Sequence, residues 1–143
     1  MEYMVDGKNN EMASFLSVTW EDAIILCKWL IFIKFVQREI RRGNKYDAIV
    51  MDPPSYGRGA NGEVWNIEES LYPLVELCTQ ILSDRPLFFL INSYTTGLSP
   101  TILANILSMT IKQKGKISCG EVGLPMKDSR LTLPCGIYGR WEE

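Results

Sequence analysis

The sequence predicts an α/β fold, with a doubly wound, mostly parallel sheet and an antiparallel pair of strands at its C-terminal end. Short apolar runs that stop abruptly, at residues 48–51 and 87–91, are typical of strands buried on both faces. Stretches with apolar residues spaced by three or four alternate with these runs and predict helices. Two β-like runs, at residues 116–124 and 131–138, then follow each other around a turn-like segment and predict the antiparallel pair.

The first predicted helix spans residues 20–42 and stops at Gly43-Asn44. Within its apolar part, residues 24–33, a strand remains an alternative. The apolar stretch of residues 23–36 is interrupted by Lys28 and Lys34 and is too short for a bilayer span, so we expect a buried element and no membrane partner. We expect residues 1–33 to be a divergent or poorly ordered N-terminal segment and residues 34–143 to form the C-terminal part of a domain.

Capping signals place the next two helices. Residues 55–65 hold three glycines and predict a loop, after which Asn66 caps a helix that runs to about residue 82. Ser99, followed by Pro100 at the first helical position, begins a helix that runs to about residue 112.

The composition bounds the chemistry. The chain has 143 residues, no histidine, four cysteines without a CxxC pair and a net charge of −2. We therefore expect one domain with no metal site, reduced cysteines and a cytoplasmic location. The charge indicates no overall basic field for nucleic acid.

A local basic cluster, formed by Arg38, Arg41, Arg42 and Lys45, allows two interpretations. The first is a solvated helix end, where cations complement the helix dipole. The second is a contact with substrate phosphates.

The most informative segment is YDAIVMDPPSYGRG, in which a strand ends on Asp52 and the chain continues with Pro53 and Pro54. Two prolines hold the preceding backbone extended and present carbonyl acceptors in set directions. Asp52 adds a carboxylate acceptor, and Tyr56 adds a ring on which a planar base can stack. The alternative is a strand-to-helix turn in which the prolines only stop the strand.

The second apolar strand also ends in polar residues, Asn92, Ser93 and Tyr94. The carboxyl ends of neighbouring parallel strands lie at one edge of a sheet, where α/β proteins bind ligands. We therefore predict a substrate site that combines these three residues with Ser55 and Gly57.

The motif MDPPSYGRG, together with LFFLINSYTTGLSP, resembles the class I S-adenosylmethionine (SAM)-dependent methyltransferases, and among them the bacterial group related to ribosomal RNA large-subunit methyltransferases. The resemblance implies a Rossmann-like fold, SAM as the cofactor and RNA modification as the activity. It places Asp52 at the target base and the SAM methyl group, so that Asp52 is both catalytic and cofactor-binding. Pro53 and Pro54 would position the acceptor and Tyr56 would stack on it, while Asn92, Ser93 and Tyr94 would line the other side.

Two departures from the family pattern shape the expected function. No cysteine lies at either strand end, and a covalent attack on a pyrimidine ring needs one, so we expect methylation of a nitrogen or oxygen atom. No Gly-x-Gly precedes Asp52, although the family uses a glycine-rich turn to hold SAM. The alternative function is a truncated, catalytically silent α/β domain that serves as an interaction unit, for example a homo-oligomer that covers an exposed sheet edge.

Overall fold

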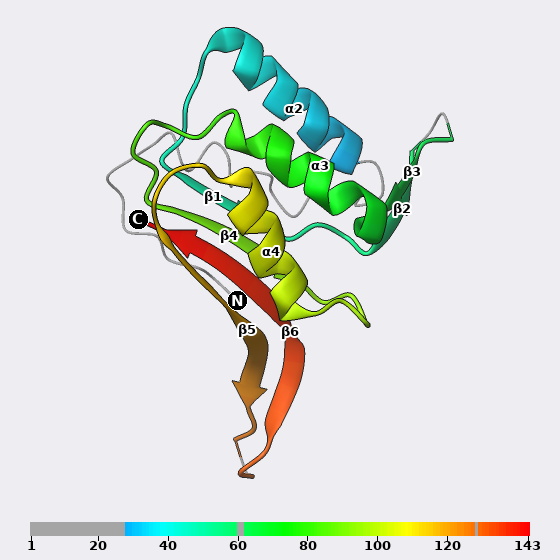
Figure 1. The fold of residues 1–143 in the computed structure, drawn as a ribbon. Helices are drawn as coiled ribbons and strands as arrows, with labels where there is room; N and C mark the ends of the chain where they lie inside the picture. Colours follow the sequence, from blue (N-terminus) through cyan, green and yellow to red (C-terminus); the bar gives the residue numbers. More distant parts are fainter. Residues whose placement is uncertain (1–27, 60–61, 128) are drawn as a thin grey trace.

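The computed structural model describes residues 28–59, 62–127 and 129–143 (Figure 1). The elements are, in chain order, α2 (Lys28–Arg42), β1 (Ala48–Met51), β2 (Tyr56–Arg58), β3 (Val64–Asn66), α3 (Ile67–Thr79), β4 (Phe88–Ser93), α4 (Pro100–Thr110), β5 (Lys116–Pro125) and β6 (Thr132–Glu142). The predicted N-terminal segment, residues 1–33, lies outside the described residues except for residues 28–33. Its expected boundary at residue 33 falls inside α2.

The main sheet has the strand order β1-β4-β6-β5. β1 pairs parallel with β4, and β6 pairs antiparallel with both β4 and β5. Three of its strands therefore run in one direction and β6 runs in the other. This arrangement confirms the predicted α/β class and the antiparallel pair at the C-terminal end.

The described helices cover one face of this sheet (Figure 1). Side chains alternate along a strand, and in β4 Phe89 and Ile91 are buried on the helical face, while Phe88 and Leu90 on the other face are only half-buried. The buried cluster joins these strand residues to residues of α2, α3 and α4. The described part of the chain thus corresponds to one side of a doubly wound sheet.

The residues predicted to end or cap the helices make the expected hydrogen bonds. After α2, the backbone N–H of Asn44 donates to the carbonyl of Glu39 at 3.1 Å. Asn66 accepts from the N–H of Glu68 at 3.2 Å at the start of α3, and Ser99 accepts from the N–H of Thr101 at 3.3 Å at the start of α4. Helices α3 and α4 end two to three residues earlier than predicted, within the ordinary uncertainty of helix boundaries.

The loop predicted for residues 55–65 is wrong. Strands β2 and β3 form an antiparallel hairpin in which Gly57 lies opposite Trp65. Gly62, at φ +88°, makes the turn, and the N–H of Gly59 donates to the carbonyl of Glu63 at 2.8 Å. The glycines therefore close a hairpin, and the buried Trp65 side chain holds the hairpin on the domain.

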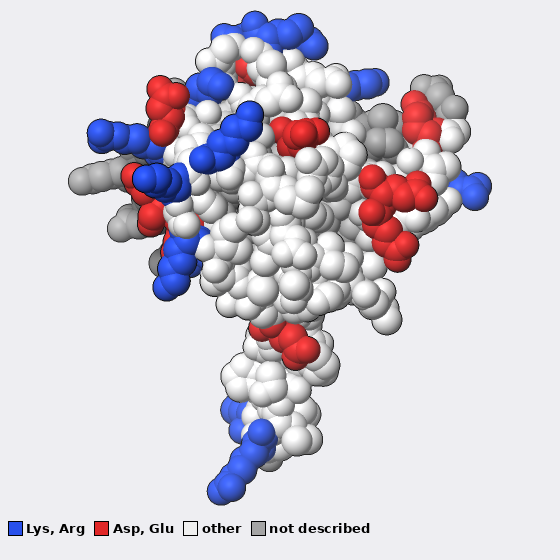
Figure 2. Space-filling model, in the orientation of Figure 1, with Lys and Arg blue, Asp and Glu red and all other residues white. Residues whose placement is uncertain are grey.

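The C-terminal strands are longer than predicted and form an arm that projects beyond the helices (Figure 1). Ladder pairing between Ser93 and Ile137 also extends β4 to include Asn92 and Ser93. Figure 2 shows positive side chains at the far end of the arm, where the sequence has Lys127 and Arg130.

Helix α4 lies so close to β6 that only glycine fits at position 139. A Cβ atom there would lie 2.6 Å from the Cβ of Leu103, which is fully buried in α4. We expect Gly139→Ala to lower the free energy of unfolding by about 1–3 kcal/mol, because the helix must move away from the sheet. Urea unfolding measures the change. Gly120→Ala is the matched control, since its Cβ meets only the Tyr138 ring, at 3.1 Å, and equal losses in the two variants would contradict the prediction.

Candidate functional site

The structure brings the ends of β1 and β4 together at the carboxyl edge of the sheet. Met51 lies opposite Ile91 in the parallel register, so the polar segments that follow leave the sheet side by side. The hydroxyl groups of Ser55 and Thr95 lie 2.7 Å apart, in hydrogen-bond contact between the two segments. Two regions that are separated by forty residues in sequence thus form one surface.

The buried residue Ser93 supports this contact through hydrogen bonds with Thr95. Its side chain is almost fully buried, at 2% exposure, and its hydroxyl donates to the Thr95 hydroxyl at 3.1 Å. The backbone N–H of Thr95 in turn donates to the Ser93 hydroxyl at 3.2 Å. The three hydroxyl groups of Ser55, Ser93 and Thr95 form a connected set, which we call the hydroxyl cluster.

The Asp-Pro-Pro segment is held in place by contacts with the rest of the protein. Pro53 is buried, and the carbonyl of Pro54 accepts a hydrogen bond from the indole N–H of Trp65 at 2.6 Å. The carbonyl of Ser55 accepts from the N–H of Ile67 at 3.1 Å. Part of the predicted set of carbonyl acceptors therefore holds the hairpin and the start of α3 in place.

Asp52 remains exposed directly after β1. Partial desolvation by the surrounding protein raises the pKa of its carboxyl group above the ordinary value. A raised pKa makes the carboxylate a stronger proton acceptor, so this position suits a group that takes a proton from a substrate.

Two exposed tyrosines follow the strand ends. Tyr56 is 50% exposed and Tyr94 is 60% exposed, so both rings are accessible to a ligand. The side chain of Arg58 donates to the Tyr56 hydroxyl at 2.8 Å, and its guanidinium lies 6.0 Å from the centre of the Tyr56 ring. An aromatic ring and a cation therefore stand next to each other in β2.

The other predicted substrate-binding residues lie apart from the hydroxyl cluster. Gly57 is buried in the hairpin. Asn92 is half-buried and, by the alternation of β4, lies on the sheet face opposite to Ser93.

Three residues that the sequence prediction did not include contribute to the site. They are Arg58, Trp65 and Thr95. A tryptophan just before a helix cap, and a threonine two positions after a strand-end serine, were the available signals.

The basic cluster makes structural contacts. Arg42 pairs with Glu39 at 3.2 Å, Arg38 lies 3.8 Å from the same carboxylate, and Lys45 donates to the carbonyl of Gln80 at 2.8 Å. These contacts favour the helix-end interpretation over the substrate-phosphate one.

No cysteine within the described ranges lies at a strand end. Cys78 is buried, which raises its pKa to about 12, and Cys119 and Cys135 are exposed in the β5–β6 arm. Cys27 lies outside the described residues.

The described part of the chain holds no cluster of side chains suited to bind a metal ion. None of the helices in that part is long and apolar enough to cross a membrane.

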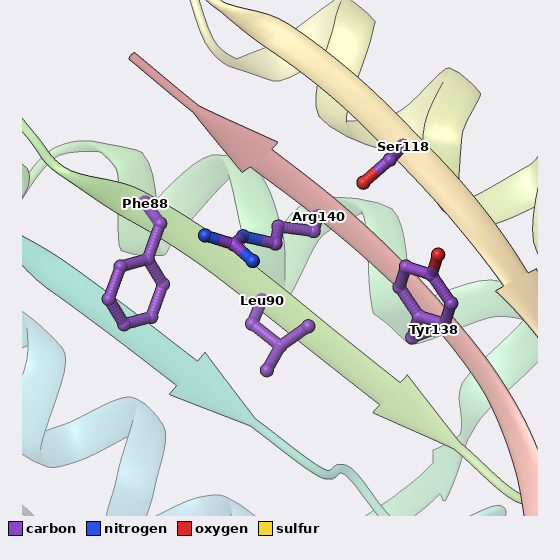
Figure 3. A pocket seen from close by; sticks show the side chains of 5 residues that line it. All are labelled: Phe88, Leu90, Ser118, Tyr138 and Arg140. Atoms are coloured by element: carbon purple, nitrogen blue, oxygen red, sulfur yellow. The ribbon is translucent and has the colours of Figure 1, made fainter. Parts of the chain in front are cut away.

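A shallow cavity of about 410 Å³ lies away from this edge, on the sheet face that the described helices leave open (Figure 3). It is lined by Phe88 and Leu90 of β4, Ser118 of β5, and Tyr138 and Arg140 of β6. The guanidinium of Arg140 lies 5.7 Å from the centre of the Phe88 ring and pairs with Glu142 at 2.6 Å. None of the predicted site residues lines this cavity.

The residues described fit only part of a SAM site. Asp52 and the proline segment form the edge at which the resemblance places the methyl group. No Gly-x-Gly precedes Asp52 in the chain, and β1 has no neighbouring strand on its outer side within the described ranges. The described residues therefore do not by themselves enclose a cofactor.

Comparisons with known proteins agree with this geometry. No family model matches the sequence, and no match was found among curated proteins. Among solved structures, a SAM-dependent methyltransferase from Agrobacterium tumefaciens is 33% identical, with a TM-score of 0.68 over 77% of this chain and 37% of that protein. SMU.776, described as a methyltransferase and solved in complex with SAH, is 18% identical, with a TM-score of 0.57 over 76% of this chain and 29% of its own.

The two comparisons carry different weight. The second likeness shows the fold alone, whereas the first combines the fold with sequence identity across most of the chain. The chain spans 37% of the length of the Agrobacterium protein. The cofactor that this resemblance implies is SAM. In its fold, its sequence identity and its Asp-Pro-Pro strand end, the chain is similar to the class I SAM-dependent methyltransferases.

Proposed function

We propose that the strand-end surface holds the planar acceptor of a SAM-dependent methyl transfer to a nitrogen or oxygen atom, and that this acceptor is part of RNA. The observation that carries the proposal is the 2.7 Å contact between the hydroxyls of Ser55 and Thr95, which joins the two polar strand ends beside Asp52. This edge of a parallel sheet is where α/β enzymes bind their substrates.

The side chains at this edge suit a non-covalent transfer. SAM, when bound, supplies an electrophilic methyl group. A neutral nitrogen that gains a methyl group must lose a proton, and the exposed Asp52 carboxylate is placed to accept it. Pro53 and Pro54 hold this segment rigid, which reduces the cost of orienting the acceptor.

RNA as the acceptor is supported by the pairing of Tyr56 with Arg58. An exposed ring can stack on a splayed base, while the adjacent guanidinium can contact a phosphate. The free cysteines of the described residues are consistent with the predicted cytoplasmic location, where RNA is available.

The stacking role of Tyr56 gives a direct test. We expect Tyr56→Ala to weaken binding of short single-stranded oligoribonucleotides by about 5-fold to 150-fold, because stacking on an aromatic ring contributes about 1–3 kcal/mol per base. Fluorescence anisotropy with labelled oligoribonucleotides measures the change. Tyr72→Ala removes another exposed tyrosine, from α3, and serves as the matched control. Equal affinities for wild type and Tyr56→Ala would contradict the stacking role.

Calorimetric titration with SAM and with SAH tests separately whether this chain binds the cofactor. Binding by the chain alone would support methyl transfer without a partner. Absence of binding at millimolar concentrations would limit the chain to the acceptor side.

The second candidate function is an interaction or oligomerisation unit. It is favoured by the open sheet face, where Val50 is 39% exposed and the cavity beside Phe88 and Leu90 is uncovered by the described helices. Light scattering distinguishes the two. A stable homo-oligomer that binds neither RNA nor SAM would favour this candidate, and a monomer that binds RNA would favour the first.

A further inference from the structure

The hydroxyl cluster joins two strand ends, and its contacts also decide which hydroxyl group donates each hydrogen bond and which accepts it. Building on the proposed function, we infer that Thr95 is a positioning residue that turns the Ser55 hydroxyl into a hydrogen-bond donor toward the acceptor. The preferred acceptor would then present a lone pair to Ser55, on a ring nitrogen or a carbonyl oxygen.

The first donor in the cluster is the hydroxyl of Ser93. Ser93 is only 2% exposed as a residue, so its hydroxyl must give its proton to a protein partner, since an unused buried donor is costly. Within the described part of the chain, the hydrogen bond of the Ser93 hydroxyl as donor goes to Thr95 Oγ1, at 3.1 Å. Ser93 also accepts from the backbone N–H of Thr95, which holds the pair in one geometry.

The donor role of Thr95 then determines the role of Ser55. With a lone pair of Thr95 Oγ1 already occupied by Ser93, the Thr95 proton is directed to its remaining neighbour, the Ser55 oxygen at 2.7 Å. Ser55 accepts this bond and keeps its own proton available. Ser55 is half-buried, and in the chain it stands between the exposed residues Asp52 and Tyr56. Its proton is therefore available to an acceptor bound at this surface.

A chain of donors explains why threonine at position 95 matters for recognition. Without the Thr95 hydroxyl, the Ser55 proton has no fixed direction, and an ordered donor becomes a freely rotating one. Asp52 and Ser55 would together read an acceptor edge that offers a proton at one atom and a lone pair at another. Nucleobases present such donor and acceptor groups on their edges.

The test measures binding of labelled poly(A), poly(C), poly(G) and poly(U) oligoribonucleotides to the full chain. We expect Thr95→Val and Ser55→Ala each to weaken the tightest complex by about fivefold, the factor that corresponds to a net hydrogen bond of about 1 kcal/mol. The double variant should be no weaker than either single one, because both remove the same bond to RNA. Thr95→Ser should restore the wild-type affinity, since it returns the hydroxyl.

Thr96→Val is the matched control. Thr96 is the exposed neighbour of Thr95, and no side-chain hydrogen bond of Thr96 is found within the described ranges. RNA binding that Thr95→Val leaves unchanged, or weakens by the same factor in the Ser55→Ala background, would overturn the inference while leaving the proposed function standing. A wild-type chain that binds no oligoribonucleotide would overturn the proposed function and this inference with it.

Discussion

Replacing Trp65 by alanine is expected to lower the free energy of unfolding by about 3–5 kcal/mol. Trp65 is 1% exposed, and its indole N–H donates to the Pro54 carbonyl at 2.6 Å. The loss is a large part of the 5–15 kcal/mol by which domains are ordinarily stable. Since Trp65 connects the β2–β3 hairpin to the proline segment, the variant should also lose the RNA binding proposed for Tyr56.

Two further variants separate packing from hydrogen bonding. Trp65→Phe keeps most of the buried ring but leaves the Pro54 carbonyl without its indole donor, so we expect a smaller loss of about 1–3 kcal/mol. Val64→Ala changes the exposed neighbouring residue and should stay within about 0.5 kcal/mol of wild type. Urea unfolding of all three variants gives the order. A Trp65→Ala variant as stable as Val64→Ala would show that the hairpin is not part of the cooperative fold.

Replacing Glu39 by alanine is the second large expected effect, a loss of about 3 kcal/mol in the free energy of unfolding. Glu39 is 3% exposed, and its carboxylate accepts hydrogen bonds from Asn44 at 2.6 Å, from the Tyr46 hydroxyl at 2.8 Å and from Arg42 at 3.2 Å. It ties the end of α2 to the segment that leads into β1. Chemical denaturation at neutral pH measures the loss.

The same carboxylate predicts a pH dependence. The hydrogen bonds from Asn44 and then Tyr46 hold the pKa of Glu39 below its ordinary value, against the opposing effect of burial. A pKa that is lower in the folded state means that the stabilisation is present above the unfolded-state pKa of about 4.3 and is lost as pH falls through the folded-state pKa.

Glu39→Gln is the control for this titration, because it keeps the shape and cannot ionise. The stability difference between wild type and Glu39→Gln should be largest near neutral pH and should shrink as the pH falls from about 5 to about 3. A difference that stays constant over this range would show that Glu39 does not titrate in the way its contacts require.

Much of the site was predictable because its signals are local. Proline restricts its own backbone and that of the residue before it, so Asp52-Pro53-Pro54 predicted a rigid strand end without any knowledge of the fold. Asn66 and Ser99 likewise predicted helix starts, since a cap bonds to an N–H only two residues away. The hairpin at residues 56–66 was missed because its glycines suggested a loop, and the burial of Trp65, which helps to hold these short strands on the domain, is a tertiary contact.

The sequence by itself determined the α/β class, the order of strands and helices apart from the β2–β3 hairpin, and the polar end of the first strand at Asp52, because periodicity, capping and proline geometry act over a few residues. The tertiary structure alone decided which side chains meet. Ser55 and Thr95 are far apart in the chain, and the parallel register of β1 with β4 brings their hydroxyls to 2.7 Å, whereas the pleat of β4 turns Asn92 to the opposite face from Ser93. Contacts between distant segments depend on strand register and packing, which no local pattern encodes.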